Sequence, residues 1–461
     1  TNTGSWSSGQ GRVNVVYQDP NNANTLYIGA PAGGIWKSTD AGVNWTPLSD
    51  YLPQIGVSGI VVDYTNSNVI YIATGDNDGG DSYSVGVLKS TDGGLTWNTT
   101  GLSFNNTNSY AGDIIMHPTN NLILFCATST GLYKTTDGGT TWSNVRTGNF
   151  AKGSVRFKPN DPSVVYGVTN TAFYKSTNTG TTFAQITSGL PASSSRLRLD
   201  VTPANANYVY VLSHSNSIST NNGFQGLYRS INSGDTFTSR NTTTNVLESN
   251  QAYYDFALAV SDTNAEEVYT GCLNIWKSTT GGTNFTKLNN WNAPTAAAYT
   301  HADIHFLKFY NGNFYCGSDG GVYKSTNGGT NFTDLTATAQ ISQFYRIAVS
   351  KQSSANMVGG LQDNGGHAYS NGGWKNYYGA DGMDTAVNPN DPNAYYGFIQ
   401  YGGTLYLSNN AGNNRTGSVN APAAETGTND DGGNWITPLK INNAGEVFAG
   451  YQRLYILSNN T

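Results

Sequence analysis

The stretch His301-Ala-Asp303-Ile-His305 places two imidazoles and a carboxylate at alternate positions. Alternate side chains of an extended strand point to the same face, so we expect these three groups to share one face. Two imidazoles and a carboxylate are suitable ligands for a transition metal. A carboxylate-oriented imidazole is equally suited to substrate contact or proton transfer. The third interpretation is a hydrogen-bonded polar cluster that fixes neighbouring loops, and the sequence leaves all three open.

Further polar side chains follow in glycine-rich stretches: Asp319 in GSDGG, Asp363 and Asn364 in GGLQDNGG, and Asp381 and Asp384 in GADGMD. With His301, Asp303 and His305 they form the predicted binding set. Two carboxyl groups roughly 5–9.5 Å apart would suit glycoside hydrolysis, for which Asp303, Asp363 and Asp384 are the candidates. The same groups would suit the hydroxyls of a glycan. The nearby aromatic residues that would suit stacking against sugars are Trp374, Tyr377, Tyr378 and Tyr401.

A separate acidic stretch reads Asp76-Asn-Asp78-Gly-Gly-Asp81. Closely spaced carboxylates with glycines for tight turning are typical of calcium-binding loops. The helix–loop–helix context of the commonest such loop is missing. The stretch predicts a calcium site at Asp76, Asp78 and Asp81, and calcium is the only cofactor we expect.

A repeated unit positions all of these residues. Its skeleton is a short apolar strand followed by Ser-x-Asp-x-Gly-x-Thr-Trp, as in GVLKSTDGGLTW, and it recurs at intervals of 41 to 54 residues. A period of about 40–50 residues with several strands per unit indicates β-propeller blades. The Asp or Asn of each copy suits a turn, and the glycine suits a positive φ. These acids are therefore expected to be structural. The copies begin at Ser38, Ser90, Thr135, Ser176, Ser230, Ser278 and Ser325.

The repeats become irregular after the seventh unit. We expect an all-β chain with a seven-bladed propeller over residues 1–338 and part of a second over residues 339–461. One ten-bladed ring is the alternative. The last unit stops where another copy of the Ser-x-Asp-x-Gly skeleton would begin, so we expect a larger parent chain. Loops between the second and third strands, and those entering the first strand, define the upper face.

The composition fits an extracellular all-β protein. Only 11% of the 461 residues are charged, glycine numbers 55 and tyrosine 30, and the net charge is −6 without a basic run, which disfavours nucleic acid as a partner. No window of about 18 apolar residues predicts a membrane span. We expect the three cysteines, in apolar strand contexts, to be buried free thiols.

Several motifs occur in a fixed order along the chain: GRVN, GAPAGGIWKSTDAGVNW, HADIH, SDGGVYKSTNGG, QFYRIAV, GGLQDNGG and ADGMD. Together they resemble bacterial sortilin-like proteins with Asp-box (BNR) repeats, often labelled glycosyl hydrolases, and in particular secreted Bacteroidetes members. The resemblance covers essentially the whole chain. It implies a propeller fold, a secreted or cell-surface location and export by type IX secretion.

The Asp box also resembles that of two-propeller xyloglucan-cleaving endoglucanases. That resemblance implies one catalytic acid in an Asp-Val-Gly-Gly stretch, where this chain has Pro31-Ala32-Gly33-Gly34. It implies a second acid in a setting that Asp363 of QDNGG matches. Because one carboxylate does not complete this mechanism, we expect a module that binds a glycan or an extracellular protein through its upper face. Glycoside hydrolysis and a structural scaffold are the alternatives.

Overall fold

The computed structural model describes residues 9–53, 56–425 and 432–457. The chain forms two compact units. The larger unit contains Arg12–Trp291 and Thr295–Ile341, and the smaller contains Ser342–Thr461 with Thr1–Gly11 and Asn292–Pro294. Both are built from antiparallel sheets, and the helical elements of the described residues are short 3-10 turns: η1 (Asn221–Gly223), η2 (Gln400–Gly402) and η3 (Ala423–Glu425). No helix in the described residues is long and apolar enough to cross a membrane.

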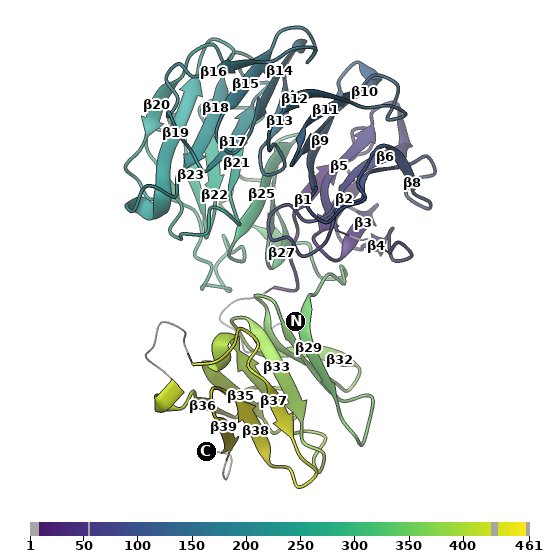
Figure 1. Ribbon diagram of the computed structural model, residues 1–461, viewed down its shortest axis with the longest axis vertical. Helices are drawn as coiled ribbons and strands as arrows, with labels where there is room; N and C mark the ends of the chain where they lie inside the picture. The colour runs from purple at the N-terminus through teal and green to yellow at the C-terminus, as the bar shows by residue number, and fades with distance from the viewer. Residues whose placement is uncertain (1–8, 54–55, 426–431, 458–461) are drawn as a thin grey trace. The chain divides into compact units, whose positions relative to one another are not determined.

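In its described residues the larger unit contains seven four-stranded sheets, each made of consecutive strands (Figure 1). The first four sheets are β1 (Val15–Gln18), β2 (Leu26–Ala30), β3 (Gly34–Ser38) and β4 (Thr46–Pro47); β5 (Val57–Asp63), β6 (Asn66–Thr74), β7 (Gly86–Ser90) and β8 (Asn98–Ser103); β9 (Ala111–His117), β10 (Asn120–Thr128), β11 (Gly131–Thr135) and β12 (Ser143–Thr147); and β13 (Val155–Lys158), β14 (Asp161–Val168), β15 (Phe173–Ser176) and β16 (Ala184–Ile186).

The remaining three sheets of the larger unit repeat this order. They are β17 (Arg196–Val201), β18 (Val209–His214), β19 (Phe224–Ser230) and β20 (Thr238–Asn241); β21 (Ala257–Val260), β22 (Val268–Gly271), β23 (Ile275–Ser278) and β24 (Thr286–Lys287); and β25 (Ile304–Tyr310), β26 (Asn313–Ser318), β27 (Gly321–Ser325) and β28 (Thr333–Asp334). The first strand of each sheet contacts the first strand of the next, so these seven are the inner strands of the unit.

The first and seventh sheets of the larger unit also lie against each other. Val13 donates its backbone N–H to the Ser318 carbonyl at 3.0 Å. The indole N–H of Trp45 donates to the Leu335 carbonyl at 2.7 Å. One hydrophobic cluster joins Val13, Val16 and Trp45 to Tyr315, Val322 and Leu335. These contacts close the sheets into a ring by face-to-face packing, without an exchanged strand.

The repeated box folds as a turn between the third and fourth strands. In the first copy, Ser38 Oγ donates to Asp40 Oδ1 and accepts the Gly42 N–H, both at 2.8 Å. Asp40 Oδ1 also accepts the N–H of Asn44, four residues on, at 2.9 Å. These hydrogen bonds, that from the Asn44 backbone foremost, lower the pKa of Asp40 to about 2. The carboxylate is thus held ionised in the turn, which supports its structural assignment.

The smaller unit contains three stacked sheets in its described residues. They are β29 (Phe344–Val349), β30 (Met357–Leu361), β31 (Gly365–Ser370) and β32 (Gly373–Tyr378); β33 (Gly382–Val387), β34 (Tyr395–Ile399), β35 (Thr404–Ser408) and β36 (Gly417–Asn420); and β37 (Leu439–Ile441), β38 (Val447–Gly450) and β39 (Leu454–Leu457). Separate apolar clusters join the first sheet to the second and the second to the third. A seven-bladed propeller followed by part of a second remains our interpretation of the two units.

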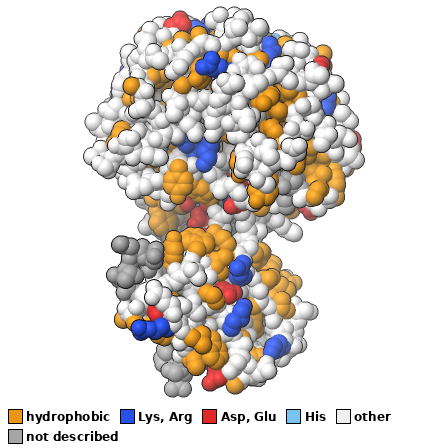
Figure 2. Space-filling model, in the orientation of Figure 1, with side chains coloured by type: hydrophobic (Ala, Val, Ile, Leu, Met, Phe, Trp, Pro, Cys, Tyr) orange, Lys and Arg blue, Asp and Glu red, His pale blue; other side chains and the backbone are white. Residues whose placement is uncertain are grey.

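The expectation for the cysteines agrees with the structure. Cys126, Cys272 and Cys316 are buried free thiols. The visible surface of the larger unit in Figure 2 is mostly white, with few charged side chains. Several charged side chains of this unit are instead buried, among them Arg12, Asp76 and Arg196.

Candidate functional site

A cluster of ion pairs and hydrogen bonds, which we call the upper network, lies at the upper face of the larger unit; most of its members are buried, whereas Asp81 is exposed. Its residues come from the loops between second and third strands and from segments that enter inner strands. They are Arg12, Asp76, Asp78, Asp81, Arg196, Tyr254, His305 and Asp319. Five of the residues predicted from sequence are therefore brought together: Asp76, Asp78, Asp81, His305 and Asp319.

Arg12 connects the acidic loop to the sixth sheet. Its Nη2 lies 2.7 Å from Asp76 Oδ2 and 2.6 Å from Asp81 Oδ2. Its Nη1 donates to the Tyr254 hydroxyl at 2.8 Å, and the guanidinium lies 5.1 Å from the centroid of that ring. Tyr254 in turn donates to Asp319 Oδ2 at 2.6 Å. Arg12 is 1% exposed, so these partners, and not water, stabilise its positive charge.

Asp78 and His305 form the second half of the upper network. Arg196 Nη2 lies 2.6 Å from Asp78 Oδ1. His305 lies between two carboxylates, with Nδ1 3.2 Å from Asp78 Oδ2 and Nε2 2.8 Å from Asp319 Oδ1. Burial acts to lower the pKa of His305, but Asp319 and Asp78 outweigh it and raise the pKa above its usual value. The raised pKa favours the cationic form of this imidazole, which joins two loops.

Asp255 differs from these paired carboxylates. It is fully buried, and Cys272 Sγ lies 3.3 Å from its Oδ1. Burial, followed by the charge of Asp303, raises its pKa well above the usual range. This favours a neutral acid at neutral pH. Because Asp255 is 0% exposed, a polysaccharide has no access to its proton.

The expectation that His301, Asp303 and His305 share one strand face is wrong. β25 begins only at Ile304, and Asp303 has a φ of 62°, which breaks the alternation. His305 enters the upper network, whereas Asp303 Oδ1 accepts a hydrogen bond from Gln251 at 2.8 Å. His301 is buried, with Nδ1 3.3 Å from the Ala302 carbonyl oxygen. These separate partners favour loop fixation over a shared metal site.

Hydrogen-bond donors surround Asp76 in the acidic loop. Asp76 accepts N–H groups from Asp78, Gly79 and Asp81 at 3.0–3.2 Å, in addition to Arg12. Its oxygens therefore face donors, whereas calcium requires six to eight oxygens facing one point. Calcium at Asp76, Asp78 and Asp81 stays a prediction. A fall in melting temperature on chelation would support it.

The other predicted site residues lie in the smaller unit, on its own upper face. The Asp363 N–H donates to Asp381 Oδ1 at 2.9 Å, and both side chains are partly exposed. Asn364 is buried and donates to the Gln362 carbonyl at 2.8 Å. Asp384 is 7% exposed and accepts the N–H of Leu439 at 2.9 Å, which anchors β37. Asp363 and Asp381 are thus the accessible pair, and Asp384 is structural.

The aromatic residues of the smaller unit separate into buried and exposed groups. Tyr377 and Tyr378 are at most 2% exposed, so their predicted role in sugar stacking is wrong. Tyr401 and Trp435 are 39% and 40% exposed, and their ring centroids lie 5.1 Å apart. Tyr401 has a φ of 57°, an unusual value for a bulky residue. Its N–H donates to the Trp435 carbonyl at 3.2 Å, which holds this conformation.

Sequence reasoning missed the cationic partners of the upper network. Arg196 lies in the strand sequence RLRLDV, where a charged side chain among apolar neighbours signals a buried partner. Trp435 was also missed as a surface aromatic; it lies in the loop that precedes β37.

Comparisons with known proteins agree with this architecture. The family profile of sortilin (neurotensin receptor 3) matches residues 33–149. The xyloglucanase Xgh74A of Acetivibrio thermocellus is 34% identical over 101 residues, which are 17% of this chain and 11% of that enzyme. The matched segment therefore spans about a tenth of the relative's length.

Two solved structures share the fold over nearly the whole chain. The GH74 enzyme of Niastella koreensis has a TM-score of 0.66 at 18% identity, covering 96% of this chain and 70% of that one. PorZ of Porphyromonas gingivalis, a surface component of the type-IX secretion system, has a TM-score of 0.53 at 12% identity, covering 98% and 58%. The chain is thus a β-propeller protein, and its resemblance to sortilin-like propellers is confirmed.

Proposed function

We propose that this chain is a carbohydrate-binding propeller region of a secreted or cell-surface protein. The observation that carries the proposal is the exposed pair Tyr401 and Trp435 on the upper face of the smaller unit. Aromatic rings offer a large, rigid surface on which the apolar face of a sugar ring can pack. Tyr401 keeps its strained backbone conformation although its ring is exposed to solvent. Backbone strain of this kind is typical of functional sites.

Polar groups for sugar hydroxyls lie on the same face of the smaller unit. Asp363 and Asp381 are partly exposed there, between β30 and β31 and before β33. The Gln400 side-chain oxygen next to Tyr401 is buried and has no hydrogen-bond partner among the described residues. A glycan is the favoured ligand because aromatic surface and neutral or acidic acceptors occur together. The similarity to xyloglucanases makes a β-glucan the first ligand to test.

Affinity electrophoresis and calorimetry with soluble xyloglucan test the proposal. The double variant Tyr401→Ala/Trp435→Ala is expected to lose at least about tenfold in affinity, because stacking contacts of roughly 1–1.5 kcal/mol are removed. Trp374→Ala is the matched control: Trp374 is 38% exposed but follows the turn between β31 and β32, at the opposite end of the sheet from the upper face, so the proposed site does not include it although the sequence predicted it to stack on a sugar. Equal losses in both variants, or no binding to any polysaccharide, would contradict a glycan site at this pair.

A glycoside hydrolase is the second candidate, favoured by the accessibility of Asp363 and Asp381. Hydrolysis needs two carboxyl groups at a defined separation, one of them a proton donor. The test is whether the protein releases new reducing ends from a polysaccharide. If it does, and if Asp363→Asn and Asp381→Asn lose this activity while they remain folded, the site is catalytic and the proposal of a pure binding site is wrong. The carboxylates of the upper network are unsuited to this role because cations and N–H groups already occupy them.

A further inference from the structure

Two adjoining cavities open at the end of the larger unit opposite the upper network. The first, of about 350 Å³, is lined by the ends of β1, β5, β9 and β13. The second, of about 410 Å³, is lined by the ends of β1, β17, β21 and β25. Tyr17 and Pro20 line both. Each inner strand contributes to one of them, so the cavities form the lower mouth of the space that the inner strands surround.

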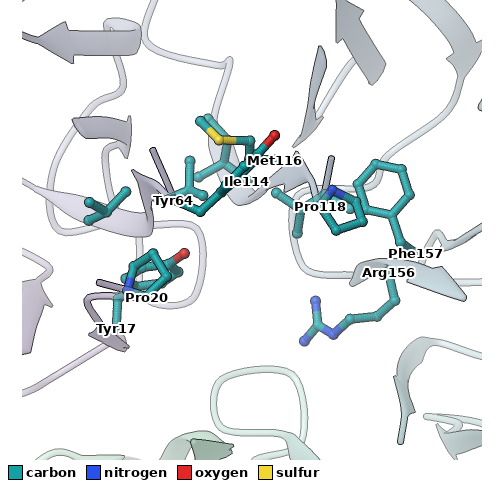
Figure 3. Close-up of a pocket in the computed structure, with 11 residues that line it drawn as sticks. Tyr17, Pro20, Tyr64, Ile114, Met116, Pro118, Arg156 and Phe157 are labelled. Carbon is teal, nitrogen blue, oxygen red and sulfur yellow. The ribbon is translucent and has the colours of Figure 1, made fainter. Parts of the chain in front are cut away.

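The first cavity, which we call the lower cavity, has an apolar wall and a single charged lining residue. The wall includes Tyr17, Tyr64, Met116, Pro118 and Phe157, and the charge belongs to Arg156 (Figure 3). Its volume lies within the range of about 300–1,000 Å³ usual for small-molecule sites. Sites of this kind combine apolar surface with a few polar groups that fix orientation.

Arg156 has one nitrogen left for a ligand. Its Nε donates to Asp200 Oδ1 at 3.0 Å, and its Nη1 donates to the Asp113 carboxylate and to the Val155 carbonyl. Its Nη2 has no hydrogen-bond partner in the described part of the chain. In Figure 3 the guanidinium extends into the space between Tyr17 and Pro20 on one side and Pro118 and Phe157 on the other. Two fixed nitrogens therefore hold the third in place.

The charges around Arg156 determine which acceptor suits it. Lys308 Nζ lies 3.2 Å from Asp200 Oδ1, so two cations face the two carboxylates of Asp113 and Asp200. Within these ion pairs the charges are already balanced, and the next cation, Arg198, is directed to Asp78 at 4.0 Å. A ligand carboxylate would add an uncompensated negative charge in a partly buried place, which is costly. A neutral carbonyl oxygen would accept the Nη2 hydrogen bond without that cost.

We propose that the lower cavity binds a neutral aromatic ligand that carries a carbonyl oxygen. The ring packs against Tyr64, Met116 and Phe157, and the carbonyl accepts a hydrogen bond from Arg156 Nη2. This site lies in the larger unit, at the face opposite the upper network. It is independent of the glycan site proposed above, so either stands if the other fails.

Three probes with the same ring system test the proposal on the whole chain. They are 2-naphthamide, which is neutral and has a carbonyl; 2-naphthoate, which is anionic; and naphthalene, which has no acceptor. Saturation-transfer NMR and fluorescence titration report their binding. We expect 2-naphthamide to bind at least about tenfold more tightly than the other two, since a hydrogen bond to a charged donor is of this order. Tightest binding of 2-naphthoate, or no binding of any probe, overturns the proposal.

Two variants locate the probe. Arg156→Lys keeps the positive charge beside Asp113 and Asp200 but removes Nη2, so it is expected to bring 2-naphthamide down to the affinity of naphthalene. Met116→Trp fills the cavity, leaves the ionic group intact, and is expected to abolish binding of 2-naphthamide. Trp374→Ala, in the other unit, is the control and should leave binding unchanged. Unchanged binding in Arg156→Lys or Met116→Trp contradicts the assignment.

Discussion

The acidic residues predicted as a site behave differently in the two units. In the larger unit, Asp76, Asp78 and Asp319 are at most 8% exposed, and arginine, histidine or tyrosine donors face their oxygens. In the smaller unit, Asp363 and Asp381 are partly exposed and linked by one backbone hydrogen bond. Paired, buried carboxylates hold loops together, whereas accessible ones beside aromatic rings suit a ligand. The following predictions test this contrast.

The largest effect is expected for Arg12→Met. This change removes the cation beside Asp76 and Asp81 and leaves the buried Asp76 charge uncompensated. Breaking a buried ion pair from one side costs about 3–5 kcal/mol of unfolding free energy. Urea denaturation of the larger unit measures it. Arg415→Met, at an exposed arginine that lies 5.1 Å from the centroid of the Tyr406 ring, should cost no more than about 1 kcal/mol. Equal losses in the two variants would contradict a structural role for the upper network.

The second prediction concerns pH. The pKa of His305 is raised in the folded protein, so its contribution to stability is full below the unfolded pKa of about 6.5 and is lost as pH rises through the higher folded pKa. The slope attributable to one proton is at most about 1.4 kcal/mol per pH unit. Comparing His305→Gln with the unaltered chain from pH 6 to 9 isolates this term. Parallel stability curves would show that His305 is not the cation between Asp78 and Asp319.

A smaller change is expected for Asp381→Ala. The Asp363 N–H loses its acceptor, at a cost of about 1 kcal/mol, confined to the smaller unit. Asp78→Ala, which leaves Arg196 without its carboxylate, is the comparison and should cost about 3–5 kcal/mol. Thermal unfolding of both variants measures the difference. Similar costs would remove the distinction between structural and accessible carboxylates.

The smallest effect is expected for Asp92→Asn in the second box. Asp92 Oδ1 accepts the Thr96 N–H at 2.9 Å, and Asn178 accepts the Thr182 N–H in the same way at 3.0 Å. An asparagine therefore fulfils the turn-forming role elsewhere in this chain, and the melting temperature should not change measurably. Asp92→Leu, which removes the acceptor, is the control that should lower it. A large fall for Asp92→Asn would mean that the charge itself is required.

How far the sequence predicts each feature depends on the range of the contacts involved. The box turn links residues within four positions, as from Ser38 to Gly42, so its pattern is visible locally. The partners of Asp78 are Arg196 and His305, which lie 118 and 227 positions away. No spacing rule connects them, because the ring of sheets brings them together. The sequence therefore identified five acidic and imidazole members of the upper network, three of them as a predicted calcium site, but not the arginines that pair with them.

The local backbone explains the predictions that are wrong. Alternation along a strand was applied to His301, Asp303 and His305, but the positive φ of Asp303 precedes the strand. Tyrosine carries a hydroxyl group and often lies at a protein surface, which favoured exposed positions for Tyr377 and Tyr378. Both lie in the core instead, where Tyr378 Oη donates to the Phe398 carbonyl. Burial of this kind depends on which sheets stack, and the irregular repeats after the seventh unit gave no register for that stacking.

Face-to-face closure of the first and seventh sheets has a consequence for protein synthesis. Each sheet of the larger unit is made of consecutive strands, so a growing chain can complete them one after another. Trp45, however, receives its hydrogen-bond partner Leu335 only 290 residues later. At translation rates of about 5–20 residues per second, the seventh sheet is synthesised roughly 15 to 60 s after the first. Until then, the apolar face of the first sheet that packs against the seventh stays uncovered. During that interval this face is exposed to chaperones and to neighbouring chains.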